Sequence, residues 1–162
     1  MSLAVFGVRR IAPALVALVL AASLVHMAPA PAAAAATSQA GAVITFARNQ
    51  LGDPWSLGAI GLRRYDCSGL VYRAFYESGV LSKIGGSRKT ARGYYLWFKE
   101  RGLASRTNPR RGDLVVWGRG SHIGIYIGDG KAISTLSNGV KVHGVHAVTA
   151  EFTAYLHVNI TR

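Results

Sequence analysis

The chain has 162 residues, of which 19 are Lys or Arg and only 7 are Asp or Glu, and half of its residues are hydrophobic. A formal net charge of +12 favours anionic partners such as nucleic acid, anionic lipid or the polymers of a bacterial envelope. The single cysteine excludes an intrachain disulfide and every zinc site built from several cysteines.

The first 36 residues have the order of a secretory signal peptide. Two arginines precede an apolar run at residues 11–25, and an Ala/Pro-rich tract then ends at Ala36. The apolar run has about 15 residues, fewer than the roughly 20 that cross a bilayer, so we expect no stable membrane span. We predict a signal peptide at 1–36, a single domain at 37–162, and a mature protein that is secreted or associated with the cell wall.

The basic residues of the mature part lack the pattern of a nucleic-acid-binding protein. Cleavage removes two arginines and no acid, which leaves a net charge of +10. The remaining cations are scattered, without an aromatic ladder or a recognition helix. An exported protein also meets wall polymers before nucleic acid. We therefore expect anionic cell-wall polymers as partners, no nucleic acid, and a monomer.

Helices are expected in the first half of the mature chain, where apolar residues recur at i, i+3 and i+4 between capping residues. The first helix begins after Thr37 or Ser38, with Leu51 on its apolar face, and ends at Gly52; the second begins at Asp66 and ends at Gly79; the third begins after Thr90 and ends at Gly102.

Strands are expected in the second half, because the apolar pattern changes there to a period of two. The predicted strands are 114–117, 123–127, 132–136, 140–142 and 155–160. Asp129-Gly130 and Asn138-Gly139 are turn signals between consecutive strands, which favours an antiparallel, meandering sheet. Helices followed by strands predict the α+β class.

Cys67 lies in the first turn of the second predicted helix. The helix dipole and the unpaired N–H groups there favour a thiolate and can stabilise an oxyanion, and Gly69 reduces crowding near the turn. The alternative for Cys67 is a small buried hydrophobic residue, which is what an unpaired cysteine usually is.

His122 is the candidate base. It begins a predicted strand in which three isoleucines share one face, while His122 shares the other with Gly124, Tyr126 and Gly128. The glycines leave room beside the imidazole for another side chain or a substrate. The alternative for His122 is a polar residue facing solvent.

Three segments resemble the NlpC/P60 family of cell-wall cysteine peptidases. They are DCSGLV at 66–71, RGDLVVW at 111–117 and HIGIYIG at 122–128, within a likeness that covers residues 42–145. The resemblance implies a papain-like α+β fold, with the cysteine on a helix start packed against an antiparallel sheet. It also implies Cys67 as nucleophile and His122 as base in the hydrolysis of peptidoglycan stem peptides, commonly at the bond from γ-D-glutamyl to a diamino acid.

The chain departs from the family pattern at two places. Trp55 stands near the position where the family often has a tyrosine, so the groove differs there or Trp55 belongs to the core. The third catalytic position, about twelve residues after the histidine, falls on Ser134. A serine is a weak partner for orienting an imidazole.

Strand register decides whether Ser134 reaches His122. A two-residue loop at 129–130 places Ser134 opposite Ile125, on the wrong face, whereas a three-residue loop with Gly130 left-handed places it opposite Gly124. A two-residue turn at 138–139 would place His143 opposite Ser134. His143 is then either a substitute orienting residue or a polar residue on an edge strand.

No histidine or carboxylate cluster has metal-ligand spacing, and no phosphate-binding glycine loop is present, so we expect no metal and no cofactor. The function expected is a secreted peptidoglycan hydrolase with a Cys-His thiol mechanism. One alternative is a non-catalytic wall-binding protein of the same fold, and another is amidase or transferase chemistry on a different acyl substrate.

Overall fold

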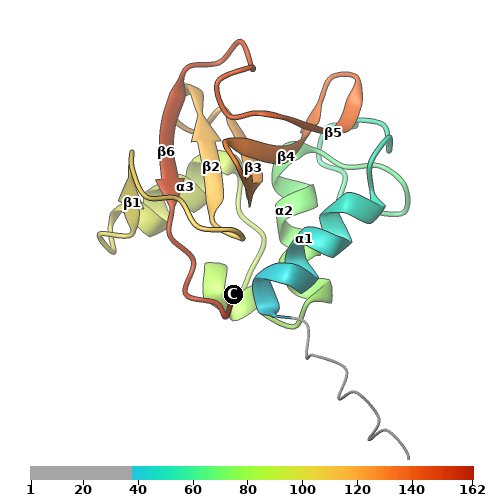
Figure 1. The fold of residues 1–162 in the computed structure, drawn as a ribbon. Coiled ribbons are helices and arrows are strands. Elements are labelled where there is room, and N and C mark those ends of the chain that lie inside the picture. Colours follow the sequence, from blue (N-terminus) through green and yellow to red (C-terminus); the bar gives the residue numbers. More distant parts are fainter. Residues whose placement is uncertain (1–37) are drawn as a thin grey trace, which may run out of the picture. The chain divides into compact units, whose positions relative to one another are not determined.

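The computed structural model describes residues 38–162, and within them the helices precede the strands (Figure 1). The helices are α1 (Gln39–Asn49), α2 (Cys67–Glu77) and α3 (Ala91–Lys99), with short 3-10 helices η1 (Leu81–Ile84) and η2 (Gly118–Gly120). The strands are β1 (Ala104–Ser105), β2 (Leu114–Trp117), β3 (His122–Gly128), β4 (Lys131–Leu136), β5 (Gly139–Gly144) and β6 (Phe152–Leu156). The α+β prediction is confirmed. The predicted signal peptide lies outside the described residues.

Each α-helix begins at a capping side chain that the sequence predicts. Ser38, Asp66 and Thr90 each accept a hydrogen bond from the backbone N–H three residues later. The end of α1 differs from the prediction, because the helix stops at Asn49 and Leu51 is 45% exposed. Gly52 instead leaves the helical path with φ 92° and donates to the carbonyl of Val140 in β5.

The sheet has the strand order β1-β6-β2-β3-β4-β5, with every pairing antiparallel. Strands β2 to β5 form the expected meander. The last strand was predicted too late, at 155–160, because β6 pairs with β2 from Phe152 to Leu156 and the residues beyond it bind elsewhere. The N–H of Val158, for example, donates to the buried carboxylate of Asp113 at 3.0 Å. The two-residue strand β1 was not predicted.

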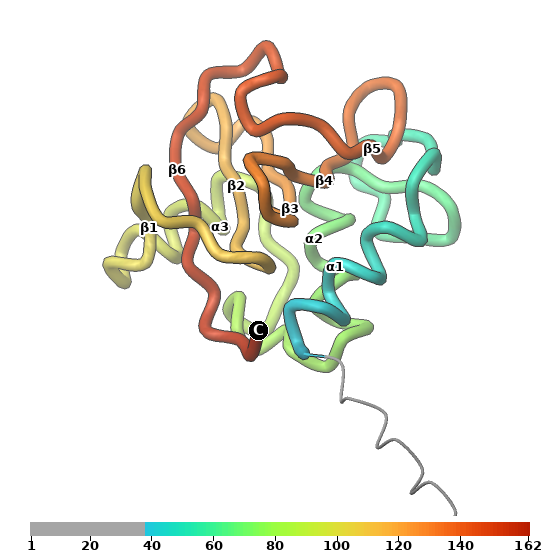
Figure 2. The backbone as a smooth tube through the Cα atoms, viewed as in Figure 1, coloured from blue at the N-terminus to red at the C-terminus, as the bar shows by residue number. Residues whose placement is uncertain are grey.

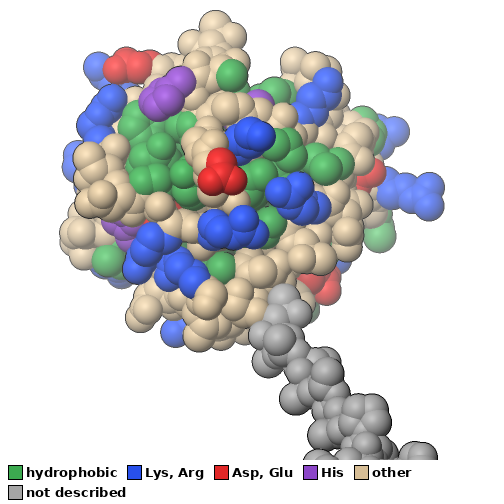
Figure 3. Space-filling model, viewed as in Figure 1, with side chains coloured by type: hydrophobic (Ala, Val, Ile, Leu, Met, Phe, Trp, Pro, Cys, Tyr) green, Lys and Arg blue, Asp and Glu red, His purple; other side chains and the backbone are tan. Residues whose placement is uncertain are grey.

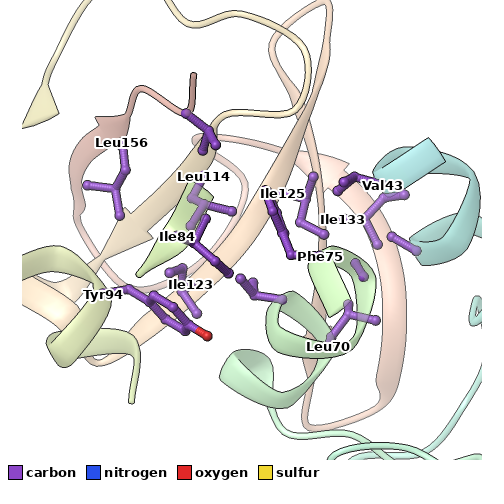
Figure 4. Close-up of a cluster of buried hydrophobic side chains, with 14 of the residues drawn as sticks. Val43, Leu70, Phe75, Ile84, Tyr94, Leu114, Ile123, Ile125, Ile133 and Leu156 are labelled. Atoms are coloured by element: carbon purple, nitrogen blue, oxygen red, sulfur yellow. The ribbon is translucent and has the colours of Figure 1, made fainter. Parts of the chain in front are cut away.

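The helices pack on one face of the sheet. Helix α2 contacts β3 and β4, α1 packs on α2, and α3 contacts β1, β3 and β6. Figure 4 shows the buried side chains between these layers, which come from both the helices and the sheet. Burial of this apolar surface is the main stabilising contribution, and it fixes α2 against β3. The labelled members are Val43, Leu70, Phe75, Ile84, Tyr94, Leu114, Ile123, Ile125, Ile133 and Leu156.

A second, smaller apolar cluster covers the opposite face of the sheet. It includes Trp117, whose indole N–H donates to the carbonyl of Val145 at 2.7 Å. The Trp117 ring lies 5.3 Å from the His122 ring and 5.5 Å from the His143 ring, measured between centroids. This fully buried indole therefore supports both imidazoles from one side.

The carboxyl end of the chain returns to the start of α1 (Figures 1 and 2). The N–H of Ala40 donates to the Thr161 carbonyl at 2.9 Å. The fully buried Asp113 accepts from Arg162 and His157 as well as from Val158. Asp113 thus joins the sheet to the C-terminal segment.

None of the helices in the described part of the chain is both long and apolar enough to cross a membrane.

Candidate active site

Cys67 is the first residue of α2, as predicted, and its side chain is partly buried against the core. Its sulfur lies at the start of β3, where a hydrogen bond from the Ile123 backbone reaches it. Ile123 follows His122 directly, so the helix start and the strand start that carry the two candidate residues adjoin.

The pKa of the Cys67 thiol is raised, mainly because burial disfavours the thiolate. The nearby Asp66 carboxylate raises it further, while backbone hydrogen bonds from Ile123, Ser68 and Cys67 itself lower it. The helix start therefore favours the thiolate as expected, but desolvation is the larger effect.

Gly69 relieves crowding at the start of α2, as expected. A Cβ at this position would lie 2.0 Å from the carbonyl oxygen of Ala59, which is far inside van der Waals contact. The same carbonyl accepts from the N–H of Asp66 at 3.0 Å. Gly69 thus lets the loop between α1 and α2 pack closely on the helix start.

Asp66 anchors the entrance to α2 through more than its predicted capping bond. Its carboxylate accepts from the Gly69 N–H at 2.6 Å, the Ser68 hydroxyl at 2.8 Å and the Gly58 N–H at 2.9 Å. Arg88 adds an ion pair at 2.6 Å, which the sequence did not predict because Arg88 lies 22 residues further on. A carboxylate with this many donors is firmly held, and so is the first turn of α2.

A cavity of about 410 Å³ opens beside this helix start. Asp66, Ser68, Arg88 and Lys89 contribute polar groups to its lining, and Leu57 contributes apolar surface. Ser68, which follows Cys67, is part of the lining, whereas Cys67 and His122 are not.

Ser134 lies on the same face of the sheet as His122. Strands β3 and β4 pair Ile125 with Ile133, which places Gly124 opposite Ser134. A Cβ on Gly124 would lie 2.9 Å from the Ser134 Cβ, so the glycine does provide the expected room. The favourable register that the sequence left open is the one adopted.

The register arises from a different turn than the one considered. The loop between β3 and β4 has two residues, Asp129 and Gly130, both with positive φ, and Gly128 pairs with Lys131. A bulge between Tyr126 and Gly128 then shifts the register by one residue. Bulge and tight turn together achieve what a three-residue loop would have done.

His143 is not opposite Ser134, so that prediction is wrong. The turn between β4 and β5 consists of residues 137 and 138, which pairs Ser134 with Lys141 and Ala132 with His143. His143 is therefore diagonal to Ser134 on the same face. Its longer side chain spans the diagonal and reaches the serine.

A continuous hydrogen-bonded chain joins the three side chains. His122 Nε2 lies 2.8 Å from Ser134 Oγ, which lies 2.7 Å from His143 Nε2, and His143 Nδ1 lies 3.0 Å from the Gly144 carbonyl oxygen. A carbonyl only accepts, so a neutral His143 carries its proton on Nδ1 and accepts at Nε2. Ser134 then donates to His143 and accepts from His122 Nε2–H. His122 is left with its lone pair on Nδ1.

The surroundings of His122 keep its ring neutral. Burial, together with a smaller contribution from repulsion by His143, lowers its pKa from 6.5 to about 4. At neutral pH the site therefore holds an uncharged thiol and an uncharged imidazole. Such an imidazole is ready to accept a proton when the thiol attacks.

Trp55, His146 and His157 lie outside the hydrogen-bonded network of His122, Ser134 and His143. Trp55 is 45% exposed and bridges to Tyr65, so it is not a core residue. His157 binds Asp113 and Ser105, and His146 stacks on Phe152. Within residues 38–162, no group of three or more His, Cys, Asp or Glu side chains has the arrangement of a metal site.

Comparison with known proteins identifies relatives of this domain. Residues 52–158 match the NlpC/P60 family. A probable endopeptidase p60 from Listeria innocua is 33% identical over 109 residues, covering 65% of this chain and 21% of that protein. A probable endopeptidase from Corynebacterium glutamicum is 32% identical over 112 residues, covering 68% of this chain and 50% of that protein. The chain thus spans about a fifth to a half of these relatives.

Solved structures give the same picture. The P60 domain of an antigen from Mycobacterium avium subspecies paratuberculosis superposes with a TM-score of 0.59 at 25% identity, covering 75% of this chain and 95% of that one. The peptidoglycan hydrolase RipB from Mycobacterium tuberculosis gives a TM-score of 0.53 at 27% identity, covering 76% of this chain and 64% of that one.

Proposed function

The chain belongs to the NlpC/P60 family, and on that premise we propose that it is a peptidoglycan hydrolase that cleaves amide bonds of stem peptides. In this proposal Cys67 is the nucleophile, His122 the general base and acid, and Ser134 the residue that orients His122. The observation that carries the assignment is the hydrogen-bonded chain from Gly144 to His122, which leaves the Nδ1 lone pair of His122 for a proton.

Catalysis begins with the neutral pair. As the Cys67 sulfur bonds to the scissile carbonyl carbon, its proton passes to His122 Nδ1, and the carbonyl oxygen becomes an oxyanion. The N–H groups at the start of α2 stabilise that negative charge, and the positive end of the helix dipole stabilises it as well. Collapse of the intermediate breaks the C–N bond, and His122 returns the proton to the leaving amine.

Water completes the reaction. His122, neutral again, removes a proton from the water molecule that attacks the thioester, and the second tetrahedral intermediate releases the acid and the Cys67 thiol. Throughout, the imidazolium formed at His122 is held by Ser134 through Nε2–H. Ser134 contacts the base and not the substrate, so it acts by positioning.

The cavity beside α2 has the chemistry for a stem peptide. The Arg88 charge is paired with Asp66, but Lys89 supplies positive charge for a peptide carboxylate, and Leu57 offers apolar surface for an alkyl chain. We propose the bond from γ-D-glutamyl to the diamino acid as the one cleaved, since this is the bond that the family resemblance implies.

The test is mass analysis of muropeptides after incubation of purified peptidoglycan with the mature protein. The expected products differ from the substrate by one water, and their masses identify the bond that was cleaved. Cys67→Ala should fold and give no product, because alanine suits a helix turn and lacks the nucleophile. Turnover by Cys67→Ala would refute the mechanism.

A non-catalytic wall-binding protein is the second candidate, and two observations favour it. Burial raises the pKa of the Cys67 thiol, and a serine stands at the third position. This candidate predicts sedimentation with purified sacculi but no muropeptide products from the unmodified protein. Products from a different acyl substrate, such as a simple amide, would indicate amidase or transferase chemistry instead.

We also propose that the protein is exported and that its basic surface retains it on anionic wall polymers as a monomer. Lys and Arg side chains are spread over the face in Figure 3. N-terminal sequencing of the secreted protein should begin near residue 37. Detection of an intact residue 1 on membrane-bound protein would contradict export by cleavage.

A further inference from the structure

The larger of the two described cavities lies between α3, η2 and the strands β1 and β6, and its volume is about 750 Å³. Four cations line it, Arg92, Lys99, Arg106 and Arg119, with Glu151 as the acidic residue. The lining therefore carries an excess of three positive charges. Among the ion pairs between described residues, none involves any of these four cations.

The four cations come from separate parts of the fold. Arg92 and Lys99 project from α3, Arg106 follows β1, and Arg119 lies in η2. Helix α3 lies beside β1 and β6 (Figure 1), which brings these segments together around one hollow. Charges on a single helix face would be ordinary solvated residues, whereas this convergence requires tertiary structure.

Two of the arginines are held in place before any ligand binds. The Arg106 guanidinium donates to the carbonyls of Phe152 and Thr153 at 3.2 Å each, and it lies 5.0 Å from the Phe152 ring centroid. Both bonds use one of its terminal nitrogens, so the rest of the donor fork remains available. Ordering this side chain on binding therefore costs little additional conformational entropy.

Arg119 is fixed through its backbone. It has a φ of 56°, and its N–H donates to the Thr153 hydroxyl at 2.8 Å. A left-handed conformation in a residue other than glycine is unfavourable without such support. This backbone conformation sets the direction in which the Arg119 side chain leaves the backbone, and Arg119 lines the cavity.

We propose that this cavity binds an anionic wall polymer whose charges are phosphodiester groups, at a site separate from the Cys67 site. Three of the four cations are arginines, whose planar forks pair with phosphate oxygens. The volume exceeds that of one phosphate and matches several repeats of a chain that carries charge along its length. That the polymer belongs to the cell wall rests on the proposed function, whereas the binding of a phosphodiester polymer does not.

Arg119, which lines the cavity, lies three residues before His122 in the sequence. A Cβ on Gly120, two residues before His122, would lie 2.7 Å from the Arg92 Cα, so α3 and η2 are in direct contact. A polymer held here would keep the Cys67 site next to the peptidoglycan to which such polymers are attached.

The test compares two double variants that remove the same number of charges. Arg106→Gln/Arg119→Gln removes two cations of the cavity, and Arg48→Gln/Lys83→Gln removes two exposed cations elsewhere. Each is made in a Cys67→Ala background, so that binding is measured without turnover. The probe is a fluorescent poly(glycerol phosphate) oligomer, and its anisotropy gives Kd at low and at moderate salt.

We expect the cavity variant to weaken binding about fivefold to tenfold, and the control variant by less than twofold. The cavity variant should also lose part of the salt dependence of Kd, because fewer counterions are released. Equal weakening in both variants would overturn the site, since net charge alone would then explain binding. Tighter binding of poly-L-glutamate or of anionic vesicles would overturn the phosphodiester assignment.

A separate measurement distinguishes this proposal from the proposed function. In the Cys67 background, the cavity variant should cleave soluble muropeptides at the unmodified rate and bind the phosphodiester oligomer poorly. Loss of soluble-substrate cleavage in that variant would show that the cavity belongs to the hydrolytic site, and would overturn a separate site. Absence of cleavage in every variant would leave the binding comparison intact and would refute only the hydrolase.

Discussion

Ser134→Ala should slow hydrolysis without abolishing it. The substitution removes one hydroxyl that accepts from His122 at 2.8 Å and donates to His143 at 2.7 Å. A neutral hydrogen bond contributes about 0.5–1.5 kcal/mol, which corresponds to about twofold to tenfold in kcat. His122→Ala removes the base itself and should leave no measurable turnover.

Thr135→Val is the matched control. Thr135 is the next residue of β4, is 1% exposed, and has a hydroxyl with no hydrogen-bond partner among the described residues. Removing that hydroxyl should leave kcat unchanged and should not reduce the free energy of unfolding. A similar fall in kcat for Thr135→Val and Ser134→Ala would indicate general packing damage.

His143→Ala separates orientation from simple packing. Without His143, the Ser134 hydroxyl loses its acceptor and can donate to His122 Nε2, which places the His122 proton on Nδ1, the wrong nitrogen for a base. We therefore expect His143→Ala to slow kcat at least as much as Ser134→Ala. Nitrogen-15 shifts of the His122 ring report the tautomer directly. A protonated Nδ1 in the unmodified protein at neutral pH would refute the chain of reasoning.

Three further predictions follow from burial and close contact. Because the pKa of His122 is lowered to about 4, kcat/KM should fall as the pH is lowered, with a midpoint near pH 4. The unfolded chain takes up this proton near pH 6.5, so the free energy of unfolding should drop by at most about 3 kcal/mol as the pH is lowered from 6.5 to 4. The same pH dependence of stability in a His122→Gln variant would contradict this. Alkylation of Cys67 by iodoacetamide should accelerate as pH rises through and beyond 9, since burial raises the thiol pKa, and a plateau below pH 7 would show a thiolate at rest. Gly69→Ala should lower the unfolding free energy by more than about 1 kcal/mol, because its Cβ would lie 2.0 Å from the Ala59 carbonyl oxygen. Gly93→Ala is the matched control, since Gly93 is also the third residue of its helix but its Cβ would meet only side-chain atoms, at 3.2 Å or more; equal losses would remove the clash from the explanation.

Local patterns predict the helices and most of the sheet because these depend on nearby residues. The caps at Ser38, Asp66 and Thr90 are side-chain bonds spanning three residues, so the sequence contains both partners. The alternation in β3 likewise predicts that His122 and Gly124 share a face, as they do. The resemblance to a known family added the pairing of Cys67 with His122.

Contacts that depend on strand register or on segments distant in the sequence could not be predicted from local patterns. Strand β6 was misplaced because its bounds follow from pairing with β2, and His143 was misplaced because the turn before β5 begins one residue earlier than the Asn-Gly signal. The ion pair between Arg88 and Asp66 has no local signal at all. A single-residue change in a turn moves every later side chain of the strand to a new partner.

The use of a serine at the third position has a physical consequence for the residue behind it. A carboxylate there can only accept from His122 Nε2–H, whereas a hydroxyl can also donate, and would then favour the opposite tautomer. The direction of the Ser134 hydroxyl is set by His143, and the direction of His143 is set by the Gly144 carbonyl, which cannot donate. Ser134 is fully buried and β4 holds it against Gly124, so a small side chain is also the one that fits between the two imidazoles. In the proposed mechanism, Ser134 and His143 therefore act together to orient His122. The Gly144 carbonyl is the acceptor that fixes the direction of these hydrogen bonds, as a carboxylate at the third position would.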